Sequence, residues 1–171
     1  MTQPSAPPPR ALTLEPLAGP AADSLSLPYE GRWRRRGLLT TDGGEEILLD
    51  LAEATELAEG LALTLGDGRR VALRAAPEPL AEARARDARG LARLAWHIGN
   101  RHTPCEVQEG RLLIRRDHVL EHMLEHLGAA VAHVEEPFRP EGGAYGHGRT
   151  HGHAHGHDPH HDPDAHLRDP A

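Results

Sequence analysis

The spacing of apolar residues changes along this chain near Pro77 and Pro79, and this change limits the folds that it can adopt. Before these prolines, β-prone runs alternate with glycine-containing turns, which is typical of short antiparallel strands. After Leu80, apolar residues recur with a period of about 3.6 residues, which is typical of amphipathic helices. We therefore predict an α+β protein, in which a small N-terminal all-β domain precedes a domain that contains helices.

Two hairpin signals define the first domain, which we place at residues 28–77. One is centred on residues 42–44 (Asp-Gly-Gly) and the other on residues 66–68 (Gly-Asp-Gly), and each has a β-prone run on both sides. Residues 52–59 lie between the two hairpins, and their sequence is compatible with either a helical turn or a loop. The first domain is therefore expected to consist mainly of strands.

Residues 1–27 are rich in Pro, Ala and Ser, and we expect them to form a flexible leader with one short strand near residues 12–14. They lack the charged and apolar segments of a signal peptide. No apolar run in the chain approaches the roughly 18 residues of a membrane span. The single cysteine, Cys105, excludes an intramolecular disulfide, which fits a reducing compartment. These features predict a cytoplasmic protein with no membrane partner.

Residues 78–145 predict a second domain with two helices. Apolar residues spaced by three and four within residues 91–98 predict one helix, which ends at Gly99. Asp117 is a suitable N-cap for a second helix, and Gly128 ends it. The predicted strands are residues 80–85, 105–107, 111–115 and 130–134. The resulting order, β-α-β-β-α-β, is that of a ferredoxin-like domain.

The low content of aromatic residues limits how stable each domain can be. Aromatic residues make up 3% of the chain, so both cores must consist mainly of Leu, Ile, Val and Ala. Two small domains with such cores are only marginally stable by themselves. Association of two copies adds buried surface, so we expect a homodimer.

Several classes of function find no support in the sequence. Neither GxxxxGK[ST] nor GxGxxG is present, so the chain is not a nucleotide hydrolase by itself. No nucleophile–base pair or carboxylate pair stands out, so we do not expect an enzyme, and Cys105 is at most an auxiliary soft ligand. Residues 32–36 (RWRRR) are compatible with nucleic-acid binding or with a charged edge strand. The formal net charge of −7 argues against a nucleic-acid partner.

Residues 146–171 form a histidine-rich tail, and their composition predicts that they are disordered. Within residues 151–157, histidine recurs at every second position between small residues, so neighbouring imidazoles can converge on one ion. Imidazole suits Ni²⁺, Zn²⁺ and Cu²⁺. An expression tag and an inert polar spacer are the alternatives. The candidate metal ligands of the tail region are His147, His151, His153, His155, His157, His160 and His161.

A mobile tail alone makes a weak metal site, because ordering seven residues costs on the order of 10 kcal/mol. That cost is comparable to the whole apparent binding energy of a structural zinc site, about 10–16 kcal/mol. A tight site therefore needs a ligand on the folded part of the chain. His102 follows the first predicted helix, where unsatisfied carbonyl groups favour a cation, although a surface-loop histidine is the alternative. His118, His122 and His126 recur every four residues on the second helix, which fits either chelation or a solvated polar face.

Three runs and the tail, taken together, resemble one protein family. The runs are LAWHIGNRHTP (94–104), LLIRRDHVLEHMLEHLGAAV (112–131) and PFRPEGGAYG (137–146), and the histidine tail follows them. In this order and spacing they resemble the UreE family, the urease accessory nickel metallochaperones. The resemblance extends over roughly residues 28–160, and the combination of GNRH with DHVL is more specific than the histidine tail.

This resemblance implies a fold, a site and partners. The family's fold is a β domain similar to a peptide-binding domain of heat-shock co-chaperones, followed by a ferredoxin-like metal-binding domain. The histidine of GNRH, here His102, is implied to bind nickel at the interface of a dimer, which delivers Ni²⁺ to apo-urease with other accessory proteins, including the urease-activating GTPase. His118 of DHVL matches a secondary ligand, although Arg116 replaces a second histidine found in some members.

Two other functions are compatible with the same residues. One is a histidine-rich storage or buffering protein that binds Ni²⁺, Zn²⁺ or Cu²⁺ without a delivery partner. The other is a binding module that uses the β domain and residues 32–36, with the tail incidental.

Overall fold

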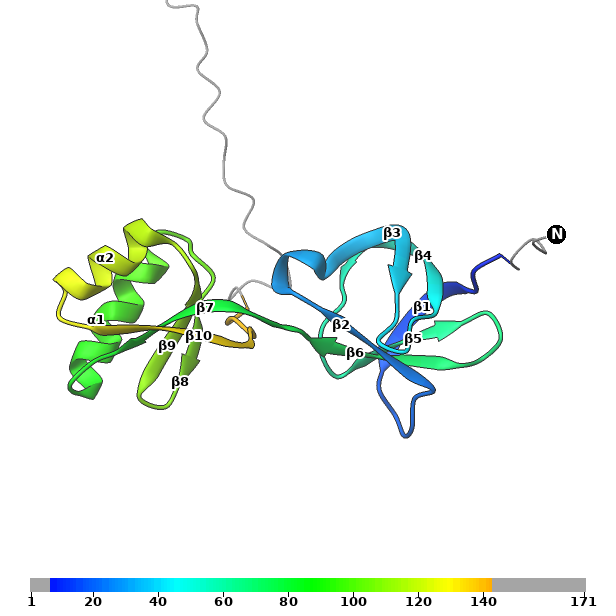
Figure 1. Ribbon diagram of the computed structural model, residues 1–171, viewed down its shortest axis with the longest axis horizontal. Coiled ribbons are helices and arrows are strands. Elements are labelled where there is room, and N and C mark those ends of the chain that lie inside the picture. Colours follow the sequence, from blue (N-terminus) through cyan, green and yellow to red (C-terminus); the bar gives the residue numbers. More distant parts are fainter. Residues whose placement is uncertain (1–6, 143–171) are drawn as a thin grey trace, which may run out of the picture.

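The computed structural model describes residues 7–142 and forms two sheets, to which two helices are added (Figure 1). The first sheet contains β1 (Arg10–Pro16), β2 (Asp23–Leu27), β3 (Trp33–Thr40), β4 (Glu46–Glu56), β5 (Leu61–Leu65) and β6 (Arg70–Ala75). The second contains β7 (Pro77–Arg84), β8 (Glu106–Gln108), β9 (Arg111–Arg115) and β10 (Ala130–Pro137). The helices are α1 (Ala88–Gly99) and α2 (His118–His126), and a short 3-10 turn, η1, spans Tyr29–Gly31. The predicted mixed α+β class is confirmed.

Both predicted hairpins are present in the first sheet, whose strand order is β2-β6-β5-β1-β4-β3. β3 pairs antiparallel with β4, and β5 pairs antiparallel with β6. Gly44 and Gly68 close the two turns with φ of +88° and +85°, values that glycine adopts without a steric penalty. β4 continues to Glu56, because the start of β3 pairs with its end. Most of the segment 52–59 is therefore strand, and the expectation of a helical turn or loop was wrong for it.

The expected flexible leader contributes two strands to the first sheet. β1 lies between β4 and β5, and its Ala11 is fully buried. β2 pairs in parallel with β6 and buries Leu25 and Leu27. The short strand near residues 12–14 is confirmed, but the rest of the prediction fails for residues 10–27. Their strand partners lie more than thirty residues away, so local composition does not reveal the pairing. Residues 1–6 lie outside the described residues.

The second sheet follows the element order predicted from the sequence. β7, α1, β8, β9, α2 and β10 succeed one another, and the strand order is β10-β7-β9-β8 with every pair antiparallel. Asp87 caps α1 by accepting a hydrogen bond from the Gly90 N–H, and Asp117 caps α2 through the N–H groups of its second and third residues. Gly128 ends α2 with φ of +92°. β10 is longer than predicted and reaches Pro137.

Pro77 and Pro79, near which the spacing of apolar residues changes, lie at the start of β7, the first strand of the second sheet. β7 is a central strand, and a proline there would normally remove a hydrogen bond from the ladder. Both prolines face only β10, because β9 pairs with residues 80–83 alone. Beside the two prolines β7 has one unpaired side, so the strand tolerates them there, and Ala76 alone separates β7 from β6.

The two faces of the second sheet have different partners. α1 and α2 cover one face, where Leu94, Ile98 and Leu124 pack on the sheet (Figure 1). The opposite face carries Leu80, Leu113 and Phe138, against which Tyr29 of η1 packs. The Tyr29 and Phe138 rings meet edge to face at 5.4 Å. η1 therefore joins the first sheet to the face of the second sheet that the helices leave open.

No helix within residues 7–142 has both the length and the apolar character that a membrane crossing requires.

Candidate metal-binding site

A hollow of about 500 Å³ lies where η1 and the start of β3 approach the segment that follows α1. Tyr29 of η1 and Trp33 of β3 line it on one side. His102, Pro104 and Cys105 line it from the connection between α1 and β8. We refer to this hollow as the cleft. The candidate ligand His102 and Cys105, three residues later in the chain, both line it.

His102 occupies a turn whose backbone is held by the end of α1. Its N–H donates to the Gly99 carbonyl at 2.9 Å, and its φ is +53°. It is the one non-glycine residue among those described with a positive φ, a conformation in which histidine is enriched but most side chains are strained. Its side chain is exposed. The result is an accessible imidazole on a constrained backbone.

The carbonyl groups at the end of α1 are not open to a bound ion. The Trp96, Ile98 and Gly99 carbonyls accept hydrogen bonds from the backbone N–H groups of residues 100, 101 and 102. The His97 carbonyl accepts one from the Arg101 guanidinium at 2.9 Å. The expectation of unsatisfied carbonyls beside His102 was therefore wrong. The imidazole itself is the group that this turn offers to a metal.

His102 supplies one donor, and the described residues add no complete ligand set. Within residues 7–142, no group of three or more His, Cys, Asp or Glu side chains is arranged to hold a metal ion. His97 is half-buried and packs edge to face on Trp96, with the ring centroids 4.9 Å apart. His118 is exposed at the first residue of α2. The predicted ligands His147, His151, His153, His155, His157, His160 and His161 lie outside the described residues.

Cys105 is a thiol rather than a thiolate at neutral pH. Burial raises its pKa to about 11, and the nearby carboxylates of Glu141 and Glu106 act in the same direction. Its thiol donates weakly to the Glu106 carbonyl at 3.8 Å. Because the thiolate is the form that attacks or binds a metal, the site does not favour either role for Cys105.

The basic residues 32–36 are engaged within the fold. Arg32 is buried, and its guanidinium donates to the carbonyls of Leu27 and Phe138. Arg34 and Arg35 donate to backbone carbonyls, and Arg36 pairs with Asp50 at 2.7 Å. β3 is the edge strand of its sheet. This arrangement favours the charged edge strand over a nucleic-acid surface.

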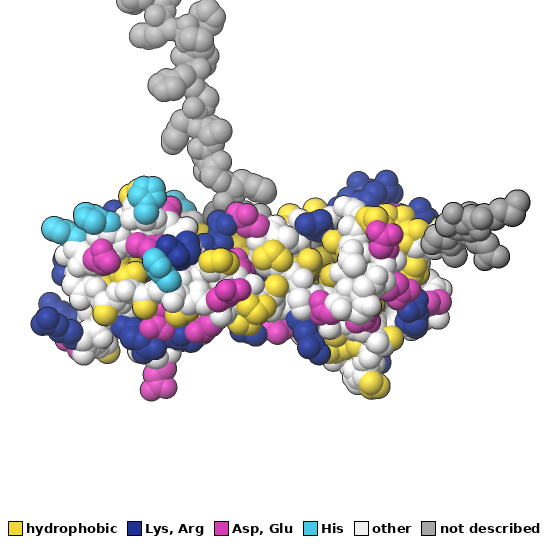
Figure 2. Space-filling model, in the orientation of Figure 1, with side chains coloured by type: hydrophobic (Ala, Val, Ile, Leu, Met, Phe, Trp, Pro, Cys, Tyr) yellow, Lys and Arg dark blue, Asp and Glu magenta, His cyan; other side chains and the backbone are white. Residues whose placement is uncertain are grey.

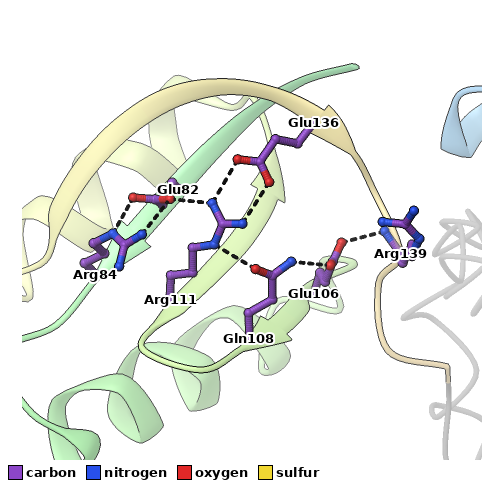
Figure 3. Close-up of polar contacts among 7 residues, drawn as sticks. All are labelled: Glu82, Arg84, Glu106, Gln108, Arg111, Glu136 and Arg139. Carbon is purple, nitrogen blue, oxygen red and sulfur yellow. Dashed lines mark hydrogen bonds and ion pairs between the residues drawn. The ribbon is translucent and has the colours of Figure 1, made fainter. Parts of the chain in front are cut away.

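Sequence reasoning missed a set of seven polar residues that supports the cleft from the open face of the second sheet (Figure 3). The set, called here the Arg111 network, consists of Glu82, Arg84, Glu106, Gln108, Arg111, Glu136 and Arg139. Arg111 donates to Glu82 at 2.7 Å and to both oxygens of Glu136 at 2.9 and 2.8 Å. In the sequence, this network is indicated only by charged residues two apart on one strand, such as Glu82 and Arg84. Their partners on other strands cannot be identified from the sequence.

The Arg111 network continues to the cleft through Glu106. Gln108 links Arg111 to one oxygen of Glu106, and the other oxygen accepts the Arg139 N–H at 2.6 Å. Beyond Arg139, the Glu141 N–H donates to the Cys105 carbonyl at 2.9 Å. The network thus ties four strands to the segment that lines the cleft opposite η1.

We expect the Arg111 network to make stability sensitive to acid. Hydrogen bonds from Arg84 and Arg111 lower the pKa of Glu82, and one from Arg111 lowers the pKa of Glu136, both from a usual 4.5. The stabilisation is therefore complete above pH 4.5 and is lost as the pH falls through the lower folded-state values. Arg111→Met should lower the free energy of unfolding by about 2 kcal/mol at pH 7. It should also make the free energy of unfolding, measured with urea, less dependent on pH on the acid side.

Arg69→Met is the matched control for that experiment. Arg69 also bridges two carboxylates, those of Asp67 and Glu45, but all three side chains are substantially exposed. Solvent screens such pairs, so this variant should change the free energy of unfolding and its pH dependence much less. Equal effects of the two substitutions would contradict a special role for the Arg111 network.

Comparison with known proteins identifies the family. A family model described as "UreE urease accessory protein, N-terminal domain" matches residues 7–76, and its C-terminal counterpart matches residues 78–166. The urease accessory protein UreE of Paracoccus denitrificans (strain Pd 1222) is 56% identical over 132 residues, which are 77% of this chain and 82% of that protein. UreE of Ruegeria pomeroyi (strain ATCC 700808 / DSM 15171 / DSS-3) is 55% identical over 130 residues, 76% of this chain and 85% of that protein.

A third relative, UreE of Cereibacter sphaeroides (strain ATCC 17023), is 54% identical over 132 residues, 77% of this chain and 70% of that protein. Together these matches define the class of protein: a urease accessory protein, not an enzyme. The chain belongs to the UreE family.

Proposed function

We propose that this protein is a metallochaperone that binds Ni²⁺ and delivers it to apo-urease during assembly of the urease metal centre. The observation that carries the proposal is the position of His102, an exposed imidazole on a constrained turn beside a cleft, in a chain of the UreE family. The proposed partners are the urease apoprotein and other urease accessory proteins, including the activating GTPase, and the proposed location is the cytoplasm.

A homodimer would explain how a single histidine holds an ion tightly. His102 needs donors from outside residues 7–142, since these hold no complete ligand set. In a two-fold dimer, a residue near the axis occurs twice. Two His102 imidazoles would then share one Ni²⁺ with little ordering cost, because each backbone is already held by α1. Zn²⁺ and Cu²⁺ would compete, since imidazole binds them as well.

The tail histidines are proposed to complete the coordination shell and to make the ion transferable. Each tail residue that becomes ordered costs about 1–2 kcal/mol, so its contribution to binding is weak and readily reversed. The proposed donors are His147, His151, His153, His155, His157, His160 and His161. His118 is the weakest of the proposed donors, because the cation of Arg116 lies two residues away and is held at 2.8 Å by Glu121.

A division into domains accompanies this proposal. Residues 28–77, extended by β1 and β2, would form the β domain, and residues 78–145 the ferredoxin-like metal-binding domain, followed by the tail at 146–171. The strand order β10-β7-β9-β8 with two helices on one face supports the ferredoxin-like assignment. The match of separate family models to residues 7–76 and 78–166 supports a division near residue 77.

The function can be tested by activation of apo-urease at limiting Ni²⁺ in the presence of the GTPase and the other accessory proteins. Wild-type protein should raise activation, and His102→Ala should reduce it to the level obtained without this protein. Truncation after Tyr145 should retain part of the activity. If omission of the protein changes nothing and it captures neither urease apoprotein nor the GTPase, the histidine-rich storage protein is the better description.

A further inference from the structure

Three histidines lie at every fourth residue on the exposed face of α2. His118, His122 and His126 are all exposed, whereas Leu120 and Leu124 on the opposite side are buried. Figure 2 shows histidine side chains gathered over the end of the molecule where α2 lies. Histidine is a poorer helix former than Ala, Glu, Lys or Arg, which exposed helix positions usually carry. Helix stability therefore does not account for this row.

Two histidines four residues apart on a helix are suited to bind one metal ion. Their Cβ atoms lie about 5–6 Å apart on the same face, and this spacing allows both rings to contact a single divalent ion. The helix already holds the backbone, so binding does not have to order the chain. We propose that His122 and His126 form an accessory site for a divalent ion that prefers imidazole, such as Zn²⁺, Ni²⁺ or Cu²⁺, independent of both His102 and the tail.

The helix dipole favours this pair over His118 and His122. His126 lies in the last turn of α2, at the far end of the helix from its partial positive charge. His118 is the first residue of the helix, where the partial positive charge repels a cation. Arg116 adds a full positive charge near His118, whereas the exposed Glu125 adds a negative charge between His122 and His126.

Both rings are available to a ligand. In the part of the chain that the structure describes, neither His122 nor His126 makes a hydrogen bond or ion pair. His133, by contrast, is bound to Glu121 at 2.8 Å, and Glu121 is also bound to Arg116. Glu121 is thereby withdrawn from any metal site on this helix. The site thus has two protein ligands, and water fills its other positions.

Binding of Zn²⁺ to the full chain, followed by NMR of the histidine ring nitrogens, tests this site. Zn²⁺ is added beyond the amount taken up by His102 and the tail, to wild type and to variants His102→Ala, His122→Ala, His126→Ala and His118→Ala. We expect the His122 and His126 signals to shift together, in wild type and in His102→Ala alike. Either His126→Ala or His122→Ala should weaken binding at the remaining ring by more than about tenfold, and His118→Ala should leave it unchanged.

A second measurement separates this site from the tail. Zn²⁺ should raise the urea midpoint of His102→Ala, because a helix site binds only the folded state. The midpoint should not rise when His122→Ala and His126→Ala are added. The proposal is overturned if the His122 shift survives His126→Ala, or if His118 responds and His126 does not. If the His122 and His126 signals shift together but the His102 signal does not respond to the metal, the result contradicts the proposed nickel site and still supports this accessory site.

Discussion

Titration of the His102→Ala variant with Ni²⁺ is expected to show no tight binding event. The remaining donors are tail histidines, whose ordering cost offsets most of their binding energy, and surface histidines such as His118. The two His102 imidazoles of the proposed dimer are the preorganised ligands, so their loss should weaken the tightest binding by about a hundredfold or more. Isothermal titration calorimetry at neutral pH measures the affinity and the stoichiometry separately.

Two comparisons make this result specific to His102. His97→Ala removes a histidine five residues earlier that packs on Trp96, and it should leave the tight event intact. Truncation after Tyr145 should lower the number of ions bound while retaining that event. A tight event that persists in His102→Ala would contradict the proposed site, and loss of the event on truncation alone would place the main ligands in the tail.

Replacement of Arg32 with alanine is expected to destabilise the protein by about 3–5 kcal/mol, the usual cost of leaving one partner of a buried ion pair alone. Arg32 is 4% exposed, and its guanidinium donates to the Phe138 carbonyl at 2.7 Å and lies 3.9 Å from Glu78. Burial lowers the pKa of Arg32, while Glu78 opposes that shift. Glu78 in turn accepts the Tyr29 N–H at 2.7 Å. The substitution therefore breaks the junction between η1 and the second sheet.

Urea unfolding at pH 7 measures this loss, and two further variants interpret it. Arg34→Ala removes a neighbouring arginine whose Nε atom donates to the Gly31 carbonyl, and it should change stability by less than about 0.5 kcal/mol. Arg32→Ala combined with Glu78→Gln should cost less than the sum of the single changes, because the two groups interact. A change below about 1 kcal/mol for Arg32→Ala would show that the junction does not depend on this arginine.

The helices and hairpins were predictable because their signals are local. Asp117 precedes α2, Gly99 and Gly128 end the two predicted helices, and apolar residues recur at the helical period. Glycine-containing turns likewise indicated β3–β4 and β5–β6. Each of these signals lies within a few residues of the element that it specifies, so a single sequence reveals it.

The strands of residues 10–27 and the surroundings of the candidate site were not predictable in the same way. β1 pairs with β4 and β5, and β2 with β6, across long separations in sequence. The polar bonds of Arg111 reach residues 25 and 29 positions away. His102 could be named from its motif, but its positive φ, the occupied carbonyls of α1 and the adjacent cleft could not.

By itself, the sequence determined the α+β class, the ends of both helices, the start of the second, the family and the identity of His102 as the candidate ligand. Only the tertiary structure decided that residues 10–27 complete the first sheet, that Arg32 is buried at the junction with the second, and that His122 and His126 have no competing partners among the described residues. The physical reason is the range of the interactions. Helix caps, turns and periodic apolar residues act between near neighbours, whereas sheet pairing, burial of charge and access to a side chain depend on residues that only folding brings together.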